Sequence, residues 1–371
     1  MKILMGYPYS SNNVYDERER TEQSISRLKK AGLKIDGFCL TLDPPNRNLT
    51  WKELDARWKR GDKKLLLMYR ELVKELEGYD VLLNSVGINL HPEFVSKLPV
   101  FTVFGCFDDP ESSDLLSKPV AWAYDLCMVG NIAEVQNYYK WGAKESRYWP
   151  LGFRPGDYNP NLTEDEIIRQ KRGIDVSLVC DYNQIRKERL DKFSKAFPQG
   201  IYYGNGWPKG FIQEYQKVPL YQNTKIGINF HLSTGPINTR TFAVPANGAM
   251  LLCDNKSFLG EIYKLGKEAV GFETVEEAID LCKYYLENED ERLKIAVRGW
   301  ERTLKDYNEI EVFRIVLKNA IELIDKKKKS EFDIYSYLNN KKINNFSRMY
   351  ELIENSNRNL YRLKRKMKKY L

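Results

Sequence analysis

The sequence is poor in histidine and has no closely spaced pair of cysteines. Its 371 residues include two histidines, and the six cysteines are scattered without a CxxC motif. A structural zinc site needs about four Cys or His ligands at close spacing, and disulfide frameworks are typical of short secreted chains. We therefore expect reduced thiols, no bound metal or other cofactor, and a cytoplasmic protein.

Long apolar runs and the common nucleotide-binding signatures are missing as well. No stretch approaches the ~18 consecutive apolar residues of a membrane-spanning helix. The opening residues, MKILMGYPYSSNN, turn polar too soon for a signal peptide. The patterns GxGxxG, GxxxxGK[ST] and GxSxG are absent. These absences argue against a dinucleotide-binding dehydrogenase, a P-loop hydrolase and a hydrolase with a nucleophile elbow.

The chain does have enough apolar side chains for two cores. With 371 residues, of which 42% are apolar and 13% aromatic, it fits two domains of roughly 150 residues each. Its net charge of +8 is concentrated in DKKKK (325–329) and YRLKRKMKKYL (361–371). Basic tails meet nucleic acid, anionic lipid or acidic protein surfaces. The nearly balanced charge of the remaining chain argues against a nucleic-acid-binding protein.

Short apolar runs alternate with helical stretches along the chain. The first half has the strand-like runs KILMGY, LKIDGFCLTL, DVLLNSVG, VFTVFG and DLCMVG, with a helical stretch over 51–78 that is interrupted near Gly61. After the Pro/Gly-rich segment YWPLGFRPGDYNP (148–160), the alternation restarts with DVSLVC, IYYG, KIGINF, AMLLCD and EAVGF. This order predicts the α/β class, with two Rossmann-like domains facing each other across a cleft.

The changes in pattern predict four parts of the chain. These are an N-terminal Rossmann-like domain (1–155), a C-terminal Rossmann-like domain (156–310), a closing helix (311–330) and a basic amphipathic tail (331–371). A four-three spacing from Met349 to Tyr370 places mostly apolar residues on one stripe of the tail. The stripe fits a helix that lies on the body of the protein, a helix pair that forms a homodimer, or a basic helix on a membrane surface.

Polar residues follow several predicted strands of the first half. Because the carboxyl ends of parallel strands meet at one edge of a sheet, we expect these residues to line the cleft. Asp108 and Asp109 follow VFTVFG, and such a residue either caps a helix or orients and deprotonates a hydroxyl. The other polar residues of this edge are Tyr7, Ser10, Asn12, Asn84 and His91, of which His91 also fits a cap of the helix PEFVSKL.

The segment NTRTFAVPANGAM (238–250) predicts an anion site. Arg240 lies at the expected start of a helix, where unpaired backbone N–H groups and a guanidinium fork can bind phosphate without a metal. Arg186 or Arg189, which follow DVSLVC, supply a second cation to the cleft or are ordinary solvated charges. His231 ends the run KIGINFH and is either a core histidine or a cleft residue.

Five segments of the second half together carry a resemblance to a known family. They are DVSLVCDYNQIRKERL, GIYYGNGWP, TKIGINFHLS, NTRTFAVPANGAMLLCD and the stretch from LGKEAVGF to RTLKDY (265–307). The first half matches more loosely, through VFGCFDDP and YWPLGFRPGDYNP. With these motifs, residues 1–325 resemble the CgeB-like (spore-maturation type) glycosyltransferases of the GT-B fold.

The resemblance implies metal-independent transfer of a sugar from a nucleotide-sugar to a protein or surface-glycan acceptor, with retention of configuration. It implies that the C-terminal domain holds the nucleotide, with the GNGW loop beside the base, and that the N-terminal domain presents the acceptor. Arg240 would neutralise the diphosphate leaving group. The predicted catalytic residues are Asp108, Asp109 and His231; the donor-binding residues are Arg240, Asn205, Gly206, Trp207, Arg186, Asn229, Thr239, Thr241 and Phe242; and the acceptor-side residues are Tyr7, Ser10, Asn12, Asn84 and His91.

Two positions depart from the family's pattern. Its usual Arg-x-Phe-Glu ends here in Ala243, which cannot make the hydrogen bonds of a glutamate to donor hydroxyls, and the strand that usually ends in Gly ends in Cys180-Asp181. Either another acid such as Asp254 or Glu273 replaces the glutamate, or the donor differs, or the protein binds weakly or does not turn over. The alternative function is a non-catalytic GT-B scaffold or sugar-binding protein whose tail binds a partner.

Overall fold

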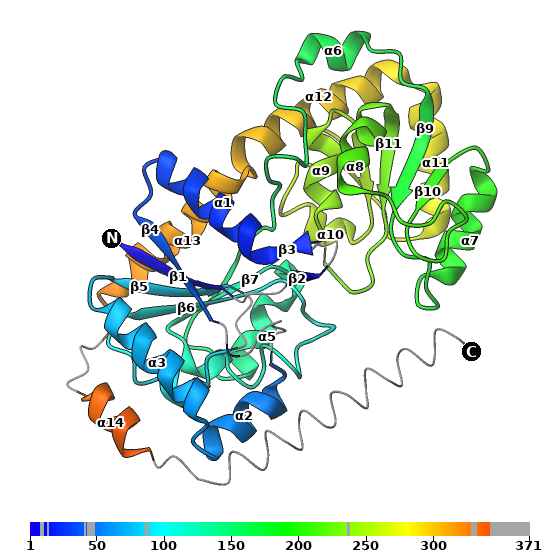
Figure 1. Cartoon of the computed structure of the whole chain (residues 1–371). Coiled ribbons are helices and arrows are strands. Elements are labelled where there is room, and N and C mark those ends of the chain that lie inside the picture. Colours follow the sequence, from blue (N-terminus) through cyan, green and yellow to red (C-terminus); the bar gives the residue numbers. More distant parts are fainter. Residues whose placement is uncertain are drawn as a thin grey trace.

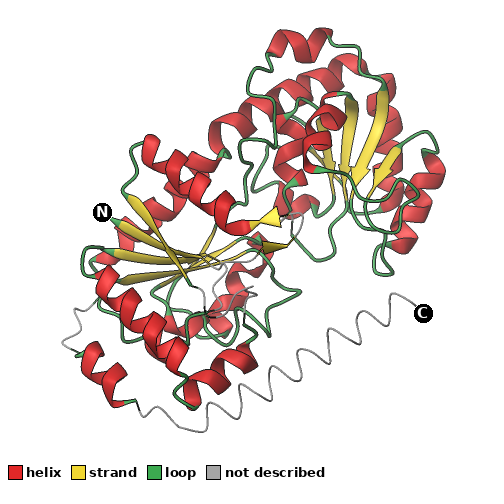
Figure 2. Cartoon of the chain, in the orientation of Figure 1, coloured by secondary structure: helices red, strands yellow, loops and turns green. Residues whose placement is uncertain are grey.

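The chain folds into two α/β units, each built on a parallel sheet covered by helices (Figures 1 and 2). This computed structural model describes residues 1–7, 11–12, 15–40, 42, 49–85, 89–235, 238–327 and 332–341. Among these residues no helix is long and apolar enough to cross a membrane. Five of the six cysteines are buried in the two units.

The first sheet has six parallel strands in the order β4-β1-β5-β6-β7-β8. Their apolar side chains are buried on both faces, as expected for a parallel sheet between helices. A short antiparallel pair, β2 (Ser11–Asn12) and β3 (Tyr15–Asp16), follows the first strand. The strands of the sheet are β1 (Ile3–Tyr7), β4 (Ile35–Cys39), β5 (Val81–Ser85), β6 (Phe101–Cys106), β7 (Leu126–Val129) and β8 (Ser146–Tyr148).

The second sheet has five parallel strands in the order β10-β9-β11-β12-β13. The chain adds β10 on one side of β9 and then returns to place β11 on the other side, so the strand order reverses between β9 and β11. In open parallel sheets, ligands bind at such a reversal, beyond the carboxyl ends of the strands. The strands are β9 (Ile174–Val179), β10 (Ile201–Tyr203), β11 (Thr224–Asn229), β12 (Met250–Cys253) and β13 (Val270–Gly271).

The helices follow the predicted alternation. Gly61 interrupts the stretch over 51–78 as expected, since its φ of +66° suits a residue without a side chain. The helices of the first unit are α1 (Glu17–Lys30), α2 (Trp51–Lys59), α3 (Lys63–Leu76), α4 (Pro92–Val95) and α5 (Val135–Lys140). Those of the second are α6 (Glu164–Arg169), α7 (Lys187–Ala196), α8 (Glu214–Gln222), α9 (Arg240–Ala246), α10 (Lys256–Leu259), α11 (Val275–Glu287) and α12 (Glu289–Asp306).

Helix α9 packs unusually close to its neighbours. A Cβ at Gly227 of β11 would lie 2.4 Å from the Val244 side chain of α9, so only glycine permits this contact. On the other side of α9, Gly299 of α12 packs near Pro245. The short helix is therefore held between the sheet and α12, which fixes the position of its first residue, Arg240.

The last described helices return to the first unit (Figure 1). Helix α13 (Glu309–Ile324), which overlaps the predicted closing helix, buries Phe313 and Val316 among residues of the first sheet and α1. Helix α14 (Ile334–Asn340) packs against α3. Residues 342–371, which contain the predicted apolar stripe, lie outside the described residues.

Glu309 ties α13 to α1, and we expect its removal to destabilise the fold. The carboxylate is buried and accepts hydrogen bonds from Ser24 and from Arg27 Nε at 2.6 Å. Burial alone would raise the pKa of Glu309, but these bonds outweigh it and hold the pKa below its usual value. Glu309→Gln should lower the free energy of unfolding by about 1.5–3 kcal/mol at neutral pH, measured by urea denaturation.

The sign of the pH dependence follows from the lowered pKa of Glu309. The stabilisation is present above the pKa of the unfolded chain and is lost as the pH falls through the folded value. Glu311→Gln is the matched control, because Glu311 forms a partly exposed pair with Arg314 on the same helix and should matter by less than about 0.5 kcal/mol. Equal effects of the two variants would contradict the role given to Glu309.

Candidate functional site

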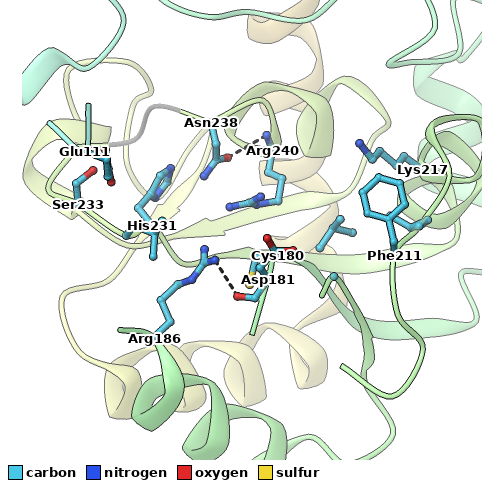
Figure 3. Close-up of a pocket in the computed structure, with 14 residues that line it drawn as sticks. Glu111, Cys180, Asp181, Arg186, Phe211, Lys217, His231, Ser233, Asn238 and Arg240 are labelled. Carbon is cyan, nitrogen blue, oxygen red and sulfur yellow. Dashed lines mark hydrogen bonds between the residues drawn. The ribbon is translucent and has the colours of Figure 1, made fainter. Parts of the chain in front are cut away.

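A cleft opens at the carboxyl end of the second sheet, at the reversal between β9 and β11 (Figure 3). It consists of two adjoining pockets of about 340 Å³ each, which share Val179, Lys217 and Arg240. The first pocket is lined by residues after β9, β10 and β11 and by Glu111 of the first unit. The second pocket reaches the linker 151–157 and Arg20 of α1, so both units contribute to the cleft.

Arg240 occupies the centre of this cleft, because it lines both pockets. Its backbone N–H donates to Asn238 Oδ1 at 3.0 Å, and its Nε donates to Asn229 Oδ1 at 2.9 Å. Among the described residues, no side chain pairs with its two terminal nitrogens, and Arg240 is only partly buried. The guanidinium is thus fixed at one edge and open to a ligand at the other.

Asn229, at the end of β11, holds this arrangement together. It is fully buried, and its Oδ1 accepts from Asn238 Nδ2 at 3.1 Å as well as from Arg240. Its Nδ2 donates to Asn238 Oδ1 at 3.0 Å and to Thr241 Oγ1 at 3.2 Å. The predicted donor-binding residues Asn229 and Thr241 therefore support Arg240 from behind.

His231 lies in the wall of the first pocket and is almost completely buried. Its Nδ1 is 2.5 Å from Asp254 Oδ1, and its backbone N–H donates to Asp254 Oδ2 at 2.8 Å. Burial lowers the pKa of His231, and the neighbouring charges of Arg240 and Arg186 lower it further, against the opposing effect of Asp254. The imidazole is therefore neutral in the folded protein at neutral pH.

Arg186 supplies the predicted second cation at the cleft, but in a structural role. Its terminal nitrogens donate to the backbone oxygens of Phe230 at 3.1 Å and Asp181 at 2.8 Å (Figure 3). Burial lowers the pKa of this guanidinium. Arg186 thus joins the loops after β9 and β11. Arg189 of α7 joins the segments after β11 and β12 by donating to His231 O and to Asp254 Oδ2.

The GNGW loop lies beside the first pocket. Asn205 is exposed and donates its backbone and side-chain N–H groups to Asp181 Oδ1 at 2.9 and 3.1 Å. Gly206 has a φ of +88° that the turn requires. Trp207 stacks on Tyr202 and donates to Cys180 O at 2.9 Å, so its ring supports the loop.

The second pocket surrounds Ala243 and contains two carboxylates. Asp157 comes from the linker and Glu214 from the start of α8, and both line the same pocket as Ala243. Burial raises the pKa of Asp157, and its Oδ2 accepts from the backbone N–H of Arg154 at 2.9 Å. Thr239, a predicted donor-binding residue, also lines this pocket. Acidic groups are therefore present beside Ala243.

A third pocket of about 140 Å³ lies on the side of the first unit and shares Leu151, Arg154 and Arg20 with the second. Its walls are mostly apolar, with Phe107 and Trp149 at the end of the first sheet. Hydroxyl groups and a buried carboxylate complete it, from Thr21, Ser24, Ser85 and Glu309. Of the residues predicted for the acceptor side, Tyr7, Asn84 and His91 do not line this pocket.

Asp109 requires a correction, because it does not face the cleft. It is fully buried and accepts hydrogen bonds from Ser113 Oγ at 2.9 Å, Ser117 Oγ at 2.8 Å and Tyr138 Oη at 2.5 Å. Asp108 is exposed but does not line the cleft pockets described above. The carboxylate that this loop brings to the first pocket is Glu111 (Figure 3).

The acceptor-side residues also need correction. Tyr7 and Asn84 point into the first unit, where Tyr7 donates to Glu22 and Asn84 Nδ2 donates to Tyr124 at 2.8 Å. His91 caps α4, with its Nδ1 accepting from the Glu93 N–H, and stacks between Trp51 and Trp58. Ser10 lies outside the described residues, and of Asn12 only its place in β2 is described.

Phe242 is a further correction to the predicted donor site. It is fully buried against Tyr263 and Tyr307, on the side of α9 that faces away from the pockets. Sequence reasoning missed the cleft residues Asn238, Ser233 and Phe211 and the residues Lys217, Arg20, Arg154, Asp157, Glu214 and Glu111. In the sequence, these residues are marked only by their proximity to a strand end or to the Pro/Gly-rich linker. Several of them lie on helices, and the packing of the helix decides whether such a side chain points into the cleft.

The two units are joined directly at the cleft by Asn131. This buried side chain donates from Nδ2 to Asp109 O at 3.1 Å and across the units to Thr234 O at 2.8 Å. Gly235 has a φ of +102°, and a Cβ there would overlap the Asn131 amide. The loop after β11 is therefore anchored to the first unit.

One group of possible metal ligands occurs among the described residues. His231, Cys253 and Asp254 place their ligand atoms within 4.8 Å of one another. The Nδ1 of His231 is occupied by the short contact with Asp254, and burial raises the pKa of the Cys253 thiol, which favours its protonated form. The group is better suited to hydrogen bonding than to binding a cation.

Comparison with known proteins agrees with this architecture. Residues 184–315 match the family model described as "Glycosyl transferase-like". No curated protein matches the sequence significantly. HepE from Anabaena, solved in complex with UDP, is 12% identical with a TM-score of 0.57, over 87% of this chain and 100% of HepE. Further solved structures share this arrangement of two α/β units.

Two of these structures are similar over nearly the whole chain. Sucrose-phosphate synthase from Thermosynechococcus elongatus is 13% identical with a TM-score of 0.59, over 88% of this chain and 100% of that one. A glycosyltransferase from Rickettsia africae is 13% identical with a TM-score of 0.58, over 88% and 99%. The predicted GT-B fold is confirmed, and the chain carries a glycosyltransferase-like domain in its second half.

The positions of Asp109 and Glu111 make a prediction about stability. Asp109→Ala should lower the free energy of unfolding by about 2–4 kcal/mol, because three buried hydroxyls lose their acceptor. Glu111→Ala should change it by less than about 0.5 kcal/mol, because Glu111 is exposed. Urea denaturation of both variants checks this, and an Asp109 variant as stable as the wild type would show that the residue is not structural.

Proposed function

We propose that the protein transfers a sugar from a UDP-sugar to an acceptor hydroxyl, with the diphosphate bound by Arg240. The observation that carries the proposal is the guanidinium at the centre of the cleft, fixed through Nε by Asn229 and open at its terminal nitrogens. UDP is proposed because HepE was solved with UDP and with UDP-glucose. The motifs of the second half support the CgeB-like subtype.

The chemistry of such a transfer fits the charges of the cleft. When the bond between the sugar and the diphosphate breaks, negative charge develops on the leaving phosphate, and a fixed guanidinium stabilises it where it forms. Lys217, whose ammonium group pairs with Glu214 at 2.6 Å, lines both pockets beside Arg240 and is a second cation in the cleft. The proposal therefore assigns the neutralising role to side chains and includes independence from a metal.

The acceptor in this proposal binds between the second and third pockets. Arg20, Leu151 and Arg154 line both, so a molecule seated against the first unit reaches the carboxylate of Asp157. We propose a protein or surface-glycan acceptor, retention of configuration, a cytoplasmic location and a partner or second copy for the basic tail. These parts rest on the sequence and on the resemblance, and the anomeric proton signal of the product in NMR tests retention.

A second candidate is a non-catalytic GT-B scaffold or sugar-binding protein, and Ala243 is the observation that favours it. The side chain at this position offers no hydrogen bond to a donor hydroxyl. Asp157 and Glu214 weigh against this candidate, because they bring carboxylates to the same pocket. Binding of UDP without any transfer or hydrolysis of UDP-sugars would favour the scaffold.

Replacing Arg240 tests the donor site. Arg240→Ala should weaken UDP binding about 10- to 100-fold, because hydrogen bonds to a charged group contribute about 1.5–3 kcal/mol. Isothermal titration calorimetry measures the affinity. The control is Arg169→Ala, which removes an exposed arginine of α6 paired with Asp165 in the same unit and should leave UDP affinity unchanged.

The same titration separates the possible outcomes. UDP affinity that is equal in Arg240→Ala and the wild type would refute the phosphate site. Affinity of the wild type that collapses with EDTA would refute metal independence. The melting temperature of each unliganded variant must stay near that of the wild type for the comparison to hold, since Arg240 is only partly buried.

We expect the carboxylate of Asp157 to lower the stability of the fold while it supports the transfer reaction. Burial raises its pKa, so the charged form is disfavoured in the folded protein and destabilises it near neutral pH. We expect Asp157→Asn to melt at or above the wild-type temperature at neutral pH while kcat/KM for transfer falls about 10-fold or more and UDP affinity stays unchanged.

The pH dependence of this difference gives the check. As the pH falls through the raised pKa, wild-type Asp157 becomes protonated and the stability advantage of the variant disappears. Thermal denaturation over a pH series measures it. Asp165→Asn is the comparison, because Asp165 is exposed, lines neither pocket and pairs with Arg169 on the surface of α6 at 2.8 Å. A variant Asp157→Asn with wild-type turnover would refute a role of this carboxylate in the reaction.

A further inference from the structure

His231 and Asp254 form a buried pair directly behind the diphosphate-binding arginine. Besides the 2.5 Å contact with His231 Nδ1, Asp254 accepts from the His231 N–H at 2.8 Å and from Arg189 Nη1 at 3.2 Å. A carboxylate with so many donors remains an acceptor, so the imidazole proton lies on Nδ1. The Nε2 atom of the neutral ring then carries a lone pair.

That lone pair faces the side-chain amide of Asn229. The Nε2 of His231 lies 3.4 Å from Nδ2 of Asn229, whose two protons are shared among this nitrogen, Asn238 Oδ1 and Thr241 Oγ1. Because Nε2 can only accept, it favours the amide orientation in which Nδ2 points to His231 and Oδ1 points the other way. In that orientation Oδ1 accepts from Nε of Arg240 at 2.9 Å. Four side chains thus form a continuous chain from Asp254 to the guanidinium.

We propose that His231 is a positioning residue, which sets the orientation of the Arg240 guanidinium through the amide of Asn229 and releases it when protonated. The inference rests on the proposed function for the identity of the ligand, UDP. The orientation of Arg240 is a property of the protein alone and can be measured without a ligand.

Protonation of His231 breaks this chain of hydrogen bonds, because it places two hydrogen-bond donors opposite each other. An imidazolium carries N–H groups on both nitrogens, so Nε2–H would face Nδ2–H₂ of Asn229. If the amide rotates to relieve this, it turns its NH₂ group toward Arg240 Nε–H, and the hydrogen bond of 2.9 Å is lost. UDP affinity is therefore full while His231 is neutral and declines as the pH falls.

The surroundings of His231 lower its pKa, so its protonation occurs below neutral pH. Burial, Arg240 and Arg186 lower the pKa of His231 below its usual value of about 6.5, while Asp254 opposes them. A lowered histidine pKa also means that its contribution to stability is present above the unfolded pKa and is lost as the pH falls through the folded one. The charged or titratable groups that face His231 are Arg186 and Arg189 of α7, Arg240 of α9, Cys253 and Asp254 at the end of β12, and Glu111 across the pocket.

Two substitutions of His231 separate positioning from packing. Glutamine places its amide near the position of Nε2 and can accept from Asn229 without titrating. Asparagine places its amide near the position of Nδ1, so it can keep the contact with Asp254 but cannot reach Asn229. His231→Gln should hold UDP affinity within about 3-fold of the wild type and remove the decline at acid pH, whereas His231→Asn should weaken affinity about 10-fold at all pH values.

A ligand-free readout is the Arg240 Nε–H signal in ¹H–¹⁵N NMR, assigned by its loss in Arg240→Lys. In the wild type we expect the chemical shift of this signal to follow a single titration at acid pH. In His231→Gln this pH-dependent shift should be absent. In His231→Asn the signal should move to the position of an unbonded guanidinium. The ionisation of UDP affects the wild type and His231→Gln equally, so it cancels in the ratio of their UDP affinities at each pH.

The outcomes distinguish this inference from the proposed function. If UDP does not bind even to the wild type, the proposed function fails, while the NMR signal still decides the positioning role. An Arg240 signal that is the same in His231→Asn and His231→Gln overturns the inference. If His231→Asn does not fold, the wild type and Arg240→Lys decide: only the wild type should show the acid decline in UDP affinity, and equal declines refute the role of His231.

Discussion

The amide of Asn229 is the contact on which the geometry of the cleft depends. It is fully buried at the end of β11, and both its oxygen and its nitrogen are used, by Asn238, Thr241 and Arg240. A buried amide that loses its partners costs about 1–3 kcal/mol, so the loop after β11 and the start of α9 cannot move independently. The side chain of Asn229, at the end of β11, therefore fixes the position of the Arg240 guanidinium.

Packing behind α9 completes this constraint. Gly227 lets the helix lie close to β11, and α12 packs against its other side, which leaves α9 little freedom to slide or tilt. Interiors packed at this density resist displacement, because any shift of the helix would open gaps or force overlaps. Arg240 is therefore presented to the cleft by a rigid element, and Arg186 joins the loop after β9 to the loop after β11.

The arrangement of the two units decides what surrounds this cation. Helix α13 returns to the first sheet, and Asn131 donates a hydrogen bond across the units to Thr234. These contacts bring Glu111 to the first pocket of the cleft and Arg20 to the second. Two carboxylates from distant parts of the chain, Asp157 and Glu214, border the pocket of Ala243. Acidic side chains thus lie beside Ala243, which the linear order of residues does not reveal.

The sequence alone determined the α/β class, the alternation of strands and helices, the break at Gly61 and the cation at Arg240. These features follow from apolar periodicity, from backbone conformations that favour glycine, and from residue order at a strand end, all of which act over a few neighbouring residues. It also indicated that His91 could cap a helix, which the structure shows.

Only the tertiary structure decided which polar residues face the cleft. Asp109 and Glu111 lie two positions apart, yet Asp109 is surrounded by Ser113, Ser117 and Tyr138, whereas Glu111 reaches the first pocket of the cleft. Whether a side chain at a strand end points inward or outward depends on hydroxyls and rings supplied by distant segments. The same holds for Asn84, which is bonded to Tyr124, and for Asp157, whose pocket exists only because the two units meet there.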